Sequence, residues 1–309
     1  MSGADGRTTP EQADPKKTTA WNGLVLHHPA SWEVARLDRD SLVWSDGPTA
    51  ALEIRWERHR GAYNPERQFR RFVRRARRKG LPQPESWQVP DSWRIALGRF
   101  IVSGFRWRRS DEEGLGLFLY CPGCRRLNLV QIHPGLSARP QMIPPLLSSL
   151  RDHPEGEVLP VRIFGIRGRL PLGSRLTQFR FETGHYRLLW RKDRLRIGLY
   201  RWAPAGIVLA RQTLEAFTRD HLQLPDRSPA GLESLTHEGW EAVGGAWSWP
   251  WRGRHRPPAW LTNHLPRRFI RVWHVRDHNC LLGVAVRGRG GGLTAMFEQL
   301  CHHCEVNPP

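Results

Sequence analysis

HYRLLWRKDRLRIGLYRW, residues 185–202, is led by aromatic side chains and alternates apolar with polar residues. Alternation with a period of two is typical of β-strands that bury one face. SWEVARLDRDSLVW, residues 31–44, has the same character, and ALEIRW at residues 51–56 continues it. These stretches predict antiparallel strands in both halves of the chain.

One order of elements occurs in each half, with an offset of about 150 residues, which indicates an internal repeat. Each half has alternating strands, a helix, further meandering strands and a closing helix. We expect the helices over residues 64–80, 142–150, 213–222 and 293–301. We expect the further strands within residues 92–107, 114–134, 238–249 and 267–288. This order predicts the α+β class, as two tandem, pseudo-repeated antiparallel-sheet-plus-helix domains.

The length of 309 residues also fits two medium-sized domains. We expect a disordered polar tail over residues 1–20, a first repeat over 21–153, a linker over 154–160 and a second repeat over 161–309. No apolar run approaches the roughly 18 residues of a membrane-spanning helix, and the opening residues lack an apolar stretch of the secretory kind. We therefore expect a cytoplasmic protein without transmembrane insertion.

The residues HPASW, positions 28–32, lead into strands and a helix. This opening, together with the order of the elements that follow it, resembles the start of the PsbP/Mog1-like α/β sandwiches. The resemblance implies a sheet packed with helices in each half. It includes no functional motif, so it implies nothing about an activity or a partner.

The formal net charge is +19, from 48 basic and 29 acidic residues. Such an excess is typical of proteins that bind nucleic acid or an acidic protein surface. Nearly all of the basic residues are arginines, which a GC-rich coding sequence also produces. The positions of the charges are therefore more informative than their total.

NPERQFRRFVRRARRKG, residues 64–80, concentrates positive charge in one predicted helix. Asn64 is a favourable N-cap, Pro65 fits the first turn, and Gly80 is a favourable stop. Apolar residues recur at the spacing of one buried stripe: Phe69, Phe72, Val73 and Ala76. Cations occupy the other faces, where we expect an anionic partner to bind: Arg67, Arg70, Arg71, Arg74, Arg75, Arg77, Arg78 and Lys79.

Like charges at these spacings repel one another, by about 0.2–0.5 kcal/mol for each i, i+4 pair. A helix this basic is easier to explain if an anion usually lies against it, although a solvated face is the alternative. The helix expected at the equivalent place in the second half contains Glu215 and Asp220 beside Arg211 and Arg219. The plan of the fold does not require an arginine array, which favours a function for it.

Four of the five cysteines form two CxxC pairs, CPGC at residues 121–124 and CHHC at residues 301–304. A CxxC turn can direct two thiolates toward one tetrahedral ion, and two such pairs complete a zinc shell. The sequence therefore predicts structural zinc at one site: Cys121, Cys124, Cys301 and Cys304. Such a site would clip the C-terminal end of the chain to the first repeat.

Other uses of these residues stay open. Ordinary reduced thiols are the main alternative, and the CHHC histidines can take part in mixed ligation. A degenerate second site can join His153, His278 and Cys280. Catalytic dithiol chemistry is disfavoured because RRLNLVQI, residues 125–132, has strand-like alternation, whereas redox CxxC motifs begin a helix.

WSWPWRGRHRPPAW, residues 247–260, interleaves tryptophan with arginine and contains several prolines. Such residues stack on exposed bases or anchor a protein interface, and they also occur as ordinary packing over a sheet. This Trp/Arg stretch adds further candidates for partner binding: Trp249, Trp251, Arg252 and Arg254.

The familiar enzyme motifs GxGxxG, HExxH, GxSxG and the P-loop are missing from the sequence, so we name no catalytic residue. We expect binding rather than catalysis. The first hypothesis is a cytoplasmic adaptor, stabilised by zinc, that uses the basic helix and the Trp/Arg stretch to hold an acidic protein partner in an assembly. The second is a nucleic-acid-binding protein that uses the same surfaces, and the third is a metal- or redox-responsive regulator.

Overall fold

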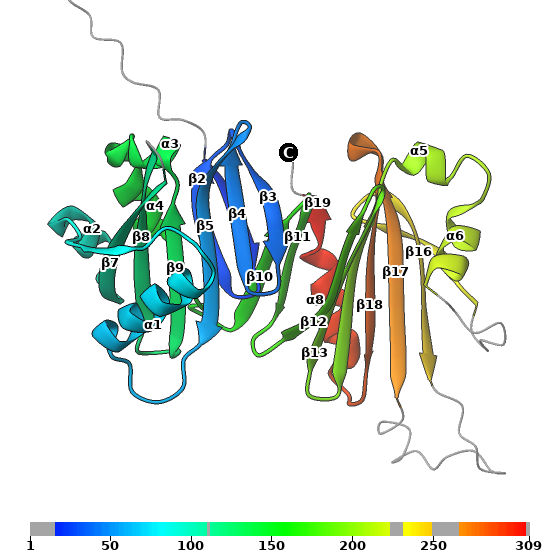
Figure 1. Cartoon of the computed structure of the whole chain (residues 1–309). Helices are drawn as coiled ribbons and strands as arrows, with labels where there is room; N and C mark the ends of the chain where they lie inside the picture. Colours follow the sequence, from blue (N-terminus) through cyan, green and yellow to red (C-terminus); the bar gives the residue numbers. More distant parts are fainter. Residues whose placement is uncertain (1–15, 110–111, 223–230, 249–265, 307–309) are drawn as a thin grey trace, which may run out of the picture. The chain divides into compact units, whose positions relative to one another are not determined.

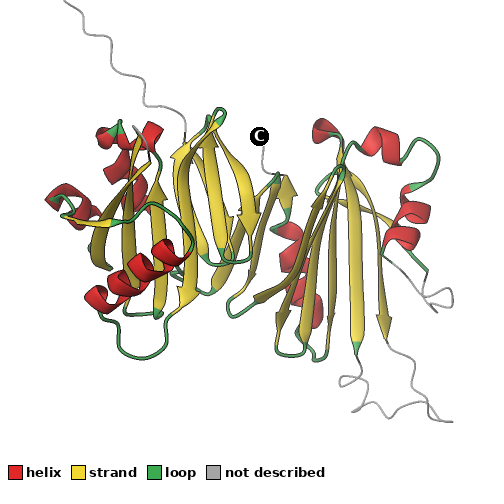
Figure 2. Ribbon diagram, viewed as in Figure 1, coloured by secondary structure: helices red, strands yellow, loops and turns green. Residues whose placement is uncertain are grey.

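The computed structural model describes residues 16–109, 112–222, 231–248 and 266–306. Within these ranges the chain forms three antiparallel sheets, of five, seven and seven strands, together with short helices (Figure 2). This is the predicted α+β class. The described residues cluster into two compact units, which we call unit 1 (16–19 and 24–153) and unit 2 (20–23 and 154–306).

Unit 1 contains a seven-stranded sheet in the order β3-β4-β5-β9-β8-β7-β6 (Figure 1). Its strands are β3 (Trp32–Asp38), β4 (Ser41–Asp46), β5 (Thr49–Arg58), β6 (Glu85–Trp87), β7 (Ile101–Arg109), β8 (Glu112–Cys121) and β9 (Arg126–Ile132). The first three strands form one meander and the last four form another. The two meanders join where β5 pairs with β9, from Leu52 opposite Ile132 to Arg58 opposite Arg126.

Unit 2 contains a second seven-stranded sheet, in the order β12-β13-β14-β18-β17-β16-β15 (Figure 1). Its strands are β12 (Arg175–Glu182), β13 (His185–Lys192), β14 (Leu195–Trp202), β15 (Glu233–His237), β16 (Trp240–Ser248), β17 (Arg267–Val275) and β18 (Cys280–Gly288). The third strand pairs with the last one here too, with Ile197 of β14 opposite Val286 of β18. Because the strand order is the same in both units, the predicted internal repeat is confirmed.

The five-stranded sheet contains β1 (Lys16–Trp21), β2 (Leu24–Pro29), β10 (Val158–Ile163), β11 (Ile166–Pro171) and β19 (Glu305–Val306). The β1–β2 hairpin turns at Asn22 and Gly23, with φ angles of 47° and 90°. The β10–β11 hairpin turns at Phe164 and Gly165, with φ angles of 46° and 77°. Two central residues with positive φ give the tight turn that matches the twist of a hairpin, and the repeat uses it twice.

The helices of unit 1 are α1 (Pro65–Arg78), α2 (Asp91–Ala96), α3 (Pro134–Ser137) and α4 (Ile143–Ser149), with a short 3₁₀ turn at Pro140–Met142. Helix α1 crosses one face of the sheet (Figure 1). Phe69 and Phe72 of α1 pack there against a buried cluster of strand residues: Phe105, Phe118, Tyr120 and Leu127.

The helices of unit 2 are α5 (Ala205–Val208), α6 (Leu214–His221) and α8 (Leu293–His302), with a 3₁₀ turn at Arg276–His278. Phe217 of α6 belongs to a core cluster that includes Ile270 of β17. Phe297 of α8 lies 5.4 Å from the ring of Phe269, also on β17. Neighbouring residues of a strand point to opposite faces, so α6 and α8 pack on opposite faces of this sheet.

The predicted elements differ from the observed ones mainly before β7. The strand expected over residues 92–107 begins only at Ile101, because residues 91–96 form helix α2. Asp91 lies in the first turn, where an acidic side chain is favourable, and Trp93 and Leu97 are buried at helical spacing.

Residues 1–15 of the expected tail lie outside the described residues, whereas residues 16–20 belong to β1. The HPASW residues join the end of β2 to the start of β3, and the His28 ring stacks on Trp32 at 6.2 Å. Among the helices that the structure describes, none has the length and apolar character needed to span a bilayer.

Candidate functional site

Helix α1 occupies the predicted range. The Asn64 Oδ1 atom accepts a hydrogen bond from the backbone N–H of Arg67 at 2.8 Å, and Pro65 lies in the first turn. Gly80 follows the helix with a φ of +63°, a conformation that residues with a side chain rarely adopt. The local signals of the sequence therefore suffice to place both ends of this helix.

The apolar stripe of α1 holds the helix against the sheet. The Phe72 ring lies 4.8 Å from that of Phe105 on β7 and 5.2 Å from that of Phe118 on β8. Ala76, one turn further along, is buried. Because this stripe fixes the rotation of the helix about its axis, its charged faces are turned away from the core.

Eight cations of α1 and its C-cap are exposed on those faces: Arg67, Arg70, Arg71, Arg74, Arg75, Arg77, Arg78 and Lys79. In the part of the chain that the structure describes, none of the eight forms an ion pair with a carboxylate. Glu66 is the one acidic residue of the helix. We call this exposed, unpaired set the basic array.

Helix α6 occupies the place in unit 2 that α1 has in unit 1, after the third strand of the sheet. Its Glu215 and Arg219 form an i, i+4 ion pair at 2.9 Å. Thr213 caps its first turn through its side chain. The same position in the fold thus carries paired charges in one unit and an unpaired basic array in the other.

The CPGC motif forms the turn between β8 and β9. The backbone N–H of Arg125 donates to the carbonyl oxygen of Cys121 at 2.9 Å, and Arg125 has a φ of +57°. Residues 126–132 form strand β9, so no helix begins at this CxxC pair. The expected hairpin is confirmed.

Two residues that follow α4 lie beside these thiols. The Sγ atom of Cys124 lies 3.1 Å from Asp152 Oδ2, and the Sγ atom of Cys121 lies 3.8 Å from His153 Nδ1. His153 Nδ1 also lies 2.7 Å from Asp152 Oδ1. One ligand atom from each of the four residues lies within 4.8 Å of the other three, so the group can hold a metal ion.

The charges of this group fit a divalent cation. Asp152 is fully buried, and the Arg126 guanidinium, which balances it, donates to the Asp152 backbone carbonyl. Burial and the neighbouring carboxylate raise the pKa of Cys124 to about 12, so without a metal this thiol stays protonated. Two thiolates would need two further positive charges, which one zinc ion supplies.

Two of the separations in the group are close to those of zinc ligands, whereas the 2.7 Å between Asp152 and His153 is that of a hydrogen bond. Sulfur and nitrogen or oxygen ligands of tetrahedral zinc lie about 3.6 Å apart, given the usual bond lengths to the ion. The observed separations of 3.1 Å for Cys124 with Asp152, and of 3.8 Å for Cys121 with His153, lie on either side of that value.

The CHHC pair lies in unit 2. Cys301 is near the end of α8, and the backbone N–H of Cys304 donates to its carbonyl oxygen. Both thiols are buried; burial raises the pKa of Cys301 to about 12 and also raises that of Cys304. Within the described ranges, these two cysteines belong to no group of three close ligands like that around Cys121. The four-cysteine zinc site stays a prediction.

Asp152 is the member of the metal group that sequence reasoning missed. His153 enters that reasoning only in a degenerate set with His278 and Cys280, which lie in unit 2. The available signal is the sequence RDHP at residues 151–154, which follows the closing helix of the first half, whereas CHHC spans the end of that of the second.

Trp249, Trp251, Arg252 and Arg254 lie outside the described residues, so their role stays a prediction. Of the twelve tryptophans among the described residues, nine are buried. The high tryptophan content of the chain is therefore largely explained by packing.

No family model and no curated protein matches the chain. The apo structure of the immunity protein TplEi of T6SS from Pseudomonas aeruginosa is 8% identical, with 95% of this chain and 97% of that chain covered and a TM-score of 0.35. The Tle4-Tli4 complex contains a chain that is 9% identical, with 95% and 98% covered and a TM-score of 0.30.

A structure from Bacteroides thetaiotaomicron VPI-5482 is 12% identical and covers 48% of this chain, at a TM-score of 0.29. This chain spans 54% of the length of that protein. Likenesses this weak say nothing about the function of this chain. The resemblance of each half to the PsbP/Mog1-like sandwiches stays a prediction.

Proposed function

We propose that this chain is a non-enzymatic cytoplasmic binding protein that holds an acidic protein partner against the basic array of α1. One observation supports this proposal most directly: all eight cations are exposed and have no carboxylate partner among the described residues. They lie on a helix whose rotation is fixed by its buried stripe. Arginine donates through a planar fork that matches a carboxylate in two hydrogen bonds. A surface with several Asp and Glu side chains therefore suits the array.

The contrast with α6 supports a selected function. The equivalent helix of unit 2 pairs Glu215 with Arg219, so the fold is compatible with a helix of balanced charge. The retention of mutually repelling cations on one helix is explained most simply if a partner neutralises their charge.

The test is affinity purification from the native host at low salt, with half of the lysate treated with nuclease. The test variant carries Arg70→Gln, Arg71→Gln, Arg74→Gln and Arg77→Gln. A matched control removes four exposed arginines of unit 2: Arg175→Gln, Arg194→Gln, Arg196→Gln and Arg211→Gln.

We expect a protein that survives nuclease treatment to co-purify with the wild type and the control, and to be lost from the test variant. Equal recovery with the test variant would remove α1 from the proposal. Loss of all bound material after nuclease treatment would instead favour the nucleic-acid alternative. Nuclease destroys the phosphate backbone that dominates such binding and leaves a protein partner intact.

We also propose that zinc stabilises unit 1 through Cys121, Cys124, Asp152 and His153. The charge balance, the closeness of the four ligand atoms and the separations of Cys124 from Asp152 and of Cys121 from His153 support the proposal. Metal analysis of the purified protein should find zinc in the wild type and little in Cys124→Ser or Asp152→Asn. These variants should also unfold at lower temperature, since the binding energy of a structural zinc ion contributes to folding.

A double variant, Cys301→Ser with Cys304→Ser, separates this site from the four-cysteine alternative. Retention of zinc in the double variant places the ion with Asp152 and His153. Loss of zinc from both the double variant and Cys124→Ser would favour the four-cysteine shell. Full zinc content in Cys124→Ser would contradict both sites.

A further inference from the structure

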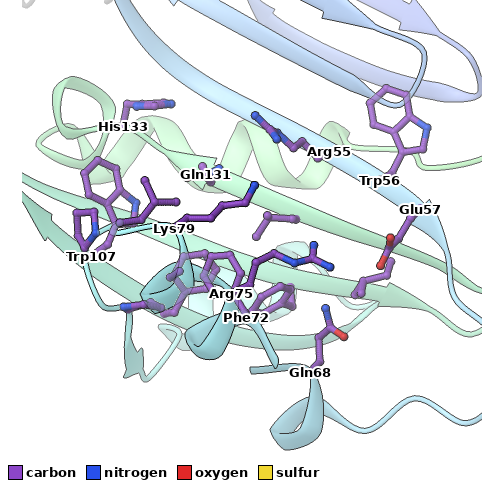
Figure 3. A pocket seen from close by; sticks show the side chains of 18 of the residues that line it. Arg55, Trp56, Glu57, Gln68, Phe72, Arg75, Lys79, Trp107, Gln131 and His133 are labelled. Carbon is purple, nitrogen blue, oxygen red and sulfur yellow. The ribbon is translucent and has the colours of Figure 1, made fainter. Parts of the chain in front are cut away.

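A cavity of 490 Å³ lies between α1 and the sheet of unit 1 (Figure 3). This volume falls within the range of pockets that bind small molecules, roughly 300–1,000 Å³. The cavity is formed by residues of α1, of the segment after it and of strands β5, β7, β8 and β9. Neither the metal group nor the exposed arginines Arg70, Arg71, Arg74 and Arg77 contribute to its wall.

One part of the wall is apolar and rigid. Phe72 of α1 lies beside Phe105 and Phe118 of the sheet, and Leu127 and Leu129 of β9 continue the surface. Phe105 and Phe118 are buried in the core, with their rings 5.2 Å apart. This part of the cavity suits an aromatic or aliphatic body.

Cations line the cavity in excess over carboxylates. Arg75 comes from α1 and Lys79 from its C-cap, and Arg55 and Arg109 come from strands, whereas Glu57 is the one acidic residue in the wall. Figure 3 shows Lys79 extending from the end of α1 toward Arg55, with Arg75 beside it. Arg55 is already paired with Glu53, but Arg75, Lys79 and Arg109 still outnumber Glu57, so an anionic group is the complement that the cavity lacks.

Aromatic rings complete the wall: Trp56, Trp107 and His133. The Trp107 ring contacts that of His133, with 6.2 Å between the ring centres. It also lies over Gly114, where a side chain would clash with it.

We propose that this cavity binds a small amphipathic anion, with its apolar body on the phenylalanine and leucine surface and its charged acceptor group near Arg75 and Lys79. Two features converge on one ligand class, since the apolar wall and the excess of cations are separate observations. Arg75 and Lys79 also belong to the basic array, but the partner test substitutes only Arg70, Arg71, Arg74 and Arg77, so the two proposals can fail separately.

The probe is 8-anilinonaphthalene-1-sulfonate, whose fluorescence reports binding in an apolar site. Its matched control is N-phenyl-1-naphthylamine, which has the same aromatic body without the sulfonate. We expect the wild type to bind the sulfonate at least about tenfold more tightly than the uncharged probe, since only the sulfonate meets the cations.

Two pairs of substitutions on the same helix test the location of the site. Arg75→Gln with Lys79→Gln should weaken binding of the sulfonate at least about tenfold and leave the uncharged probe within about twofold. Arg70→Gln with Arg74→Gln removes the same charge from outside the cavity and should change neither probe by more than about twofold. Both pairs alter exposed residues, so both variants should fold.

Leu129→Trp fills the cavity from its apolar wall and should abolish binding of both probes, with folding checked by circular dichroism. Equal weakening of the sulfonate by the two charge pairs would overturn the proposal, because the binding would then follow the net charge of the helix. Wild-type binding of the sulfonate no tighter than that of the uncharged probe would overturn it too.

Discussion

Replacing Arg74 with glutamine is expected to stabilise helix α1. All four neighbours of Arg74 at the i±3 and i±4 positions are arginines: Arg70, Arg71, Arg77 and Arg78. Each like-charged pair costs about 0.2–0.5 kcal/mol in an exposed helix at low salt, so removing four pairs stabilises α1 by about 1–2 kcal/mol. Glutamine has nearly the helix propensity of arginine, so intrinsic propensity barely changes this figure.

The assay is amide hydrogen exchange of residues 65–78, measured by mass spectrometry, because it reports the local opening of this helix. Exchange should slow by roughly five- to thirty-fold in Arg74→Gln at about 0.01 M salt, the factor that corresponds to 1–2 kcal/mol. The gain should shrink at about 1 M salt, where the screening length falls from about 30 Å to about 3 Å.

Arg58→Gln is the control, because Arg58 is exposed at the end of β5 and lies outside the helix. It should leave the exchange of residues 65–78 unchanged at either salt concentration. Unchanged or faster exchange in Arg74→Gln at low salt would refute the view that the basic array destabilises its own helix. The energetic reason for expecting an anionic partner would then be lost.

Three further substitutions test the local structure. Asn64→Ala removes the 2.8 Å capping bond to the Arg67 N–H and should lower the free energy of unfolding by about 1 kcal/mol in urea titrations, whereas Asn64→Ser should largely restore it. Gly116→Ala places a methyl group against the buried Phe105 ring and should cost about 1–3 kcal/mol; an unchanged urea midpoint would contradict this packing. Burial lowers the pKa of His28 below its ordinary value of 6.5. As the pH falls through that value, His28 therefore takes up a proton in the unfolded chain but not yet in the folded one. The free energy of unfolding should therefore decrease from pH 7 to pH 5, and His28→Gln should reduce that decrease.

Local signals made most of the fold predictable. The alternation in residues 185–202 corresponds to β13 and β14, and the signals at Asn64 and Gly80 mark the ends of α1. Helix α2 was missed because only one of its six residues, Trp93, is buried, with the buried Leu97 following as the C-cap. So short a helix shows almost no period, whereas the strand that follows it has a strong one.

The candidate sites were predictable only in part, because they depend on residues that the fold brings together. The CxxC spacing identifies Cys124 in the sequence. Asp152 is 28 positions away and is brought beside Cys124 by the packing of α4. The cavity has no sequence signal at all, since Arg55 of β5, Lys79 after α1 and His133 after β9 lie far apart in the sequence. Empty space between a helix and a sheet is set by tertiary packing, which periodicity does not report.

The pairing of the third strand with the last one governs when each sheet can be completed during synthesis. Leu52 cannot pair until Ile132, 80 positions later, has been synthesised, and Ile197 cannot pair until Val286, 89 positions later, has been synthesised. The hairpins on either side are local and can form early, whereas the central ladder requires the closure of a long loop. A nascent chain that ends before β9 therefore leaves the hydrogen-bonding edge of β5, the middle of its future sheet, open to other strands. For this topology the period of greatest aggregation risk is the translation of the residues between β5 and β9.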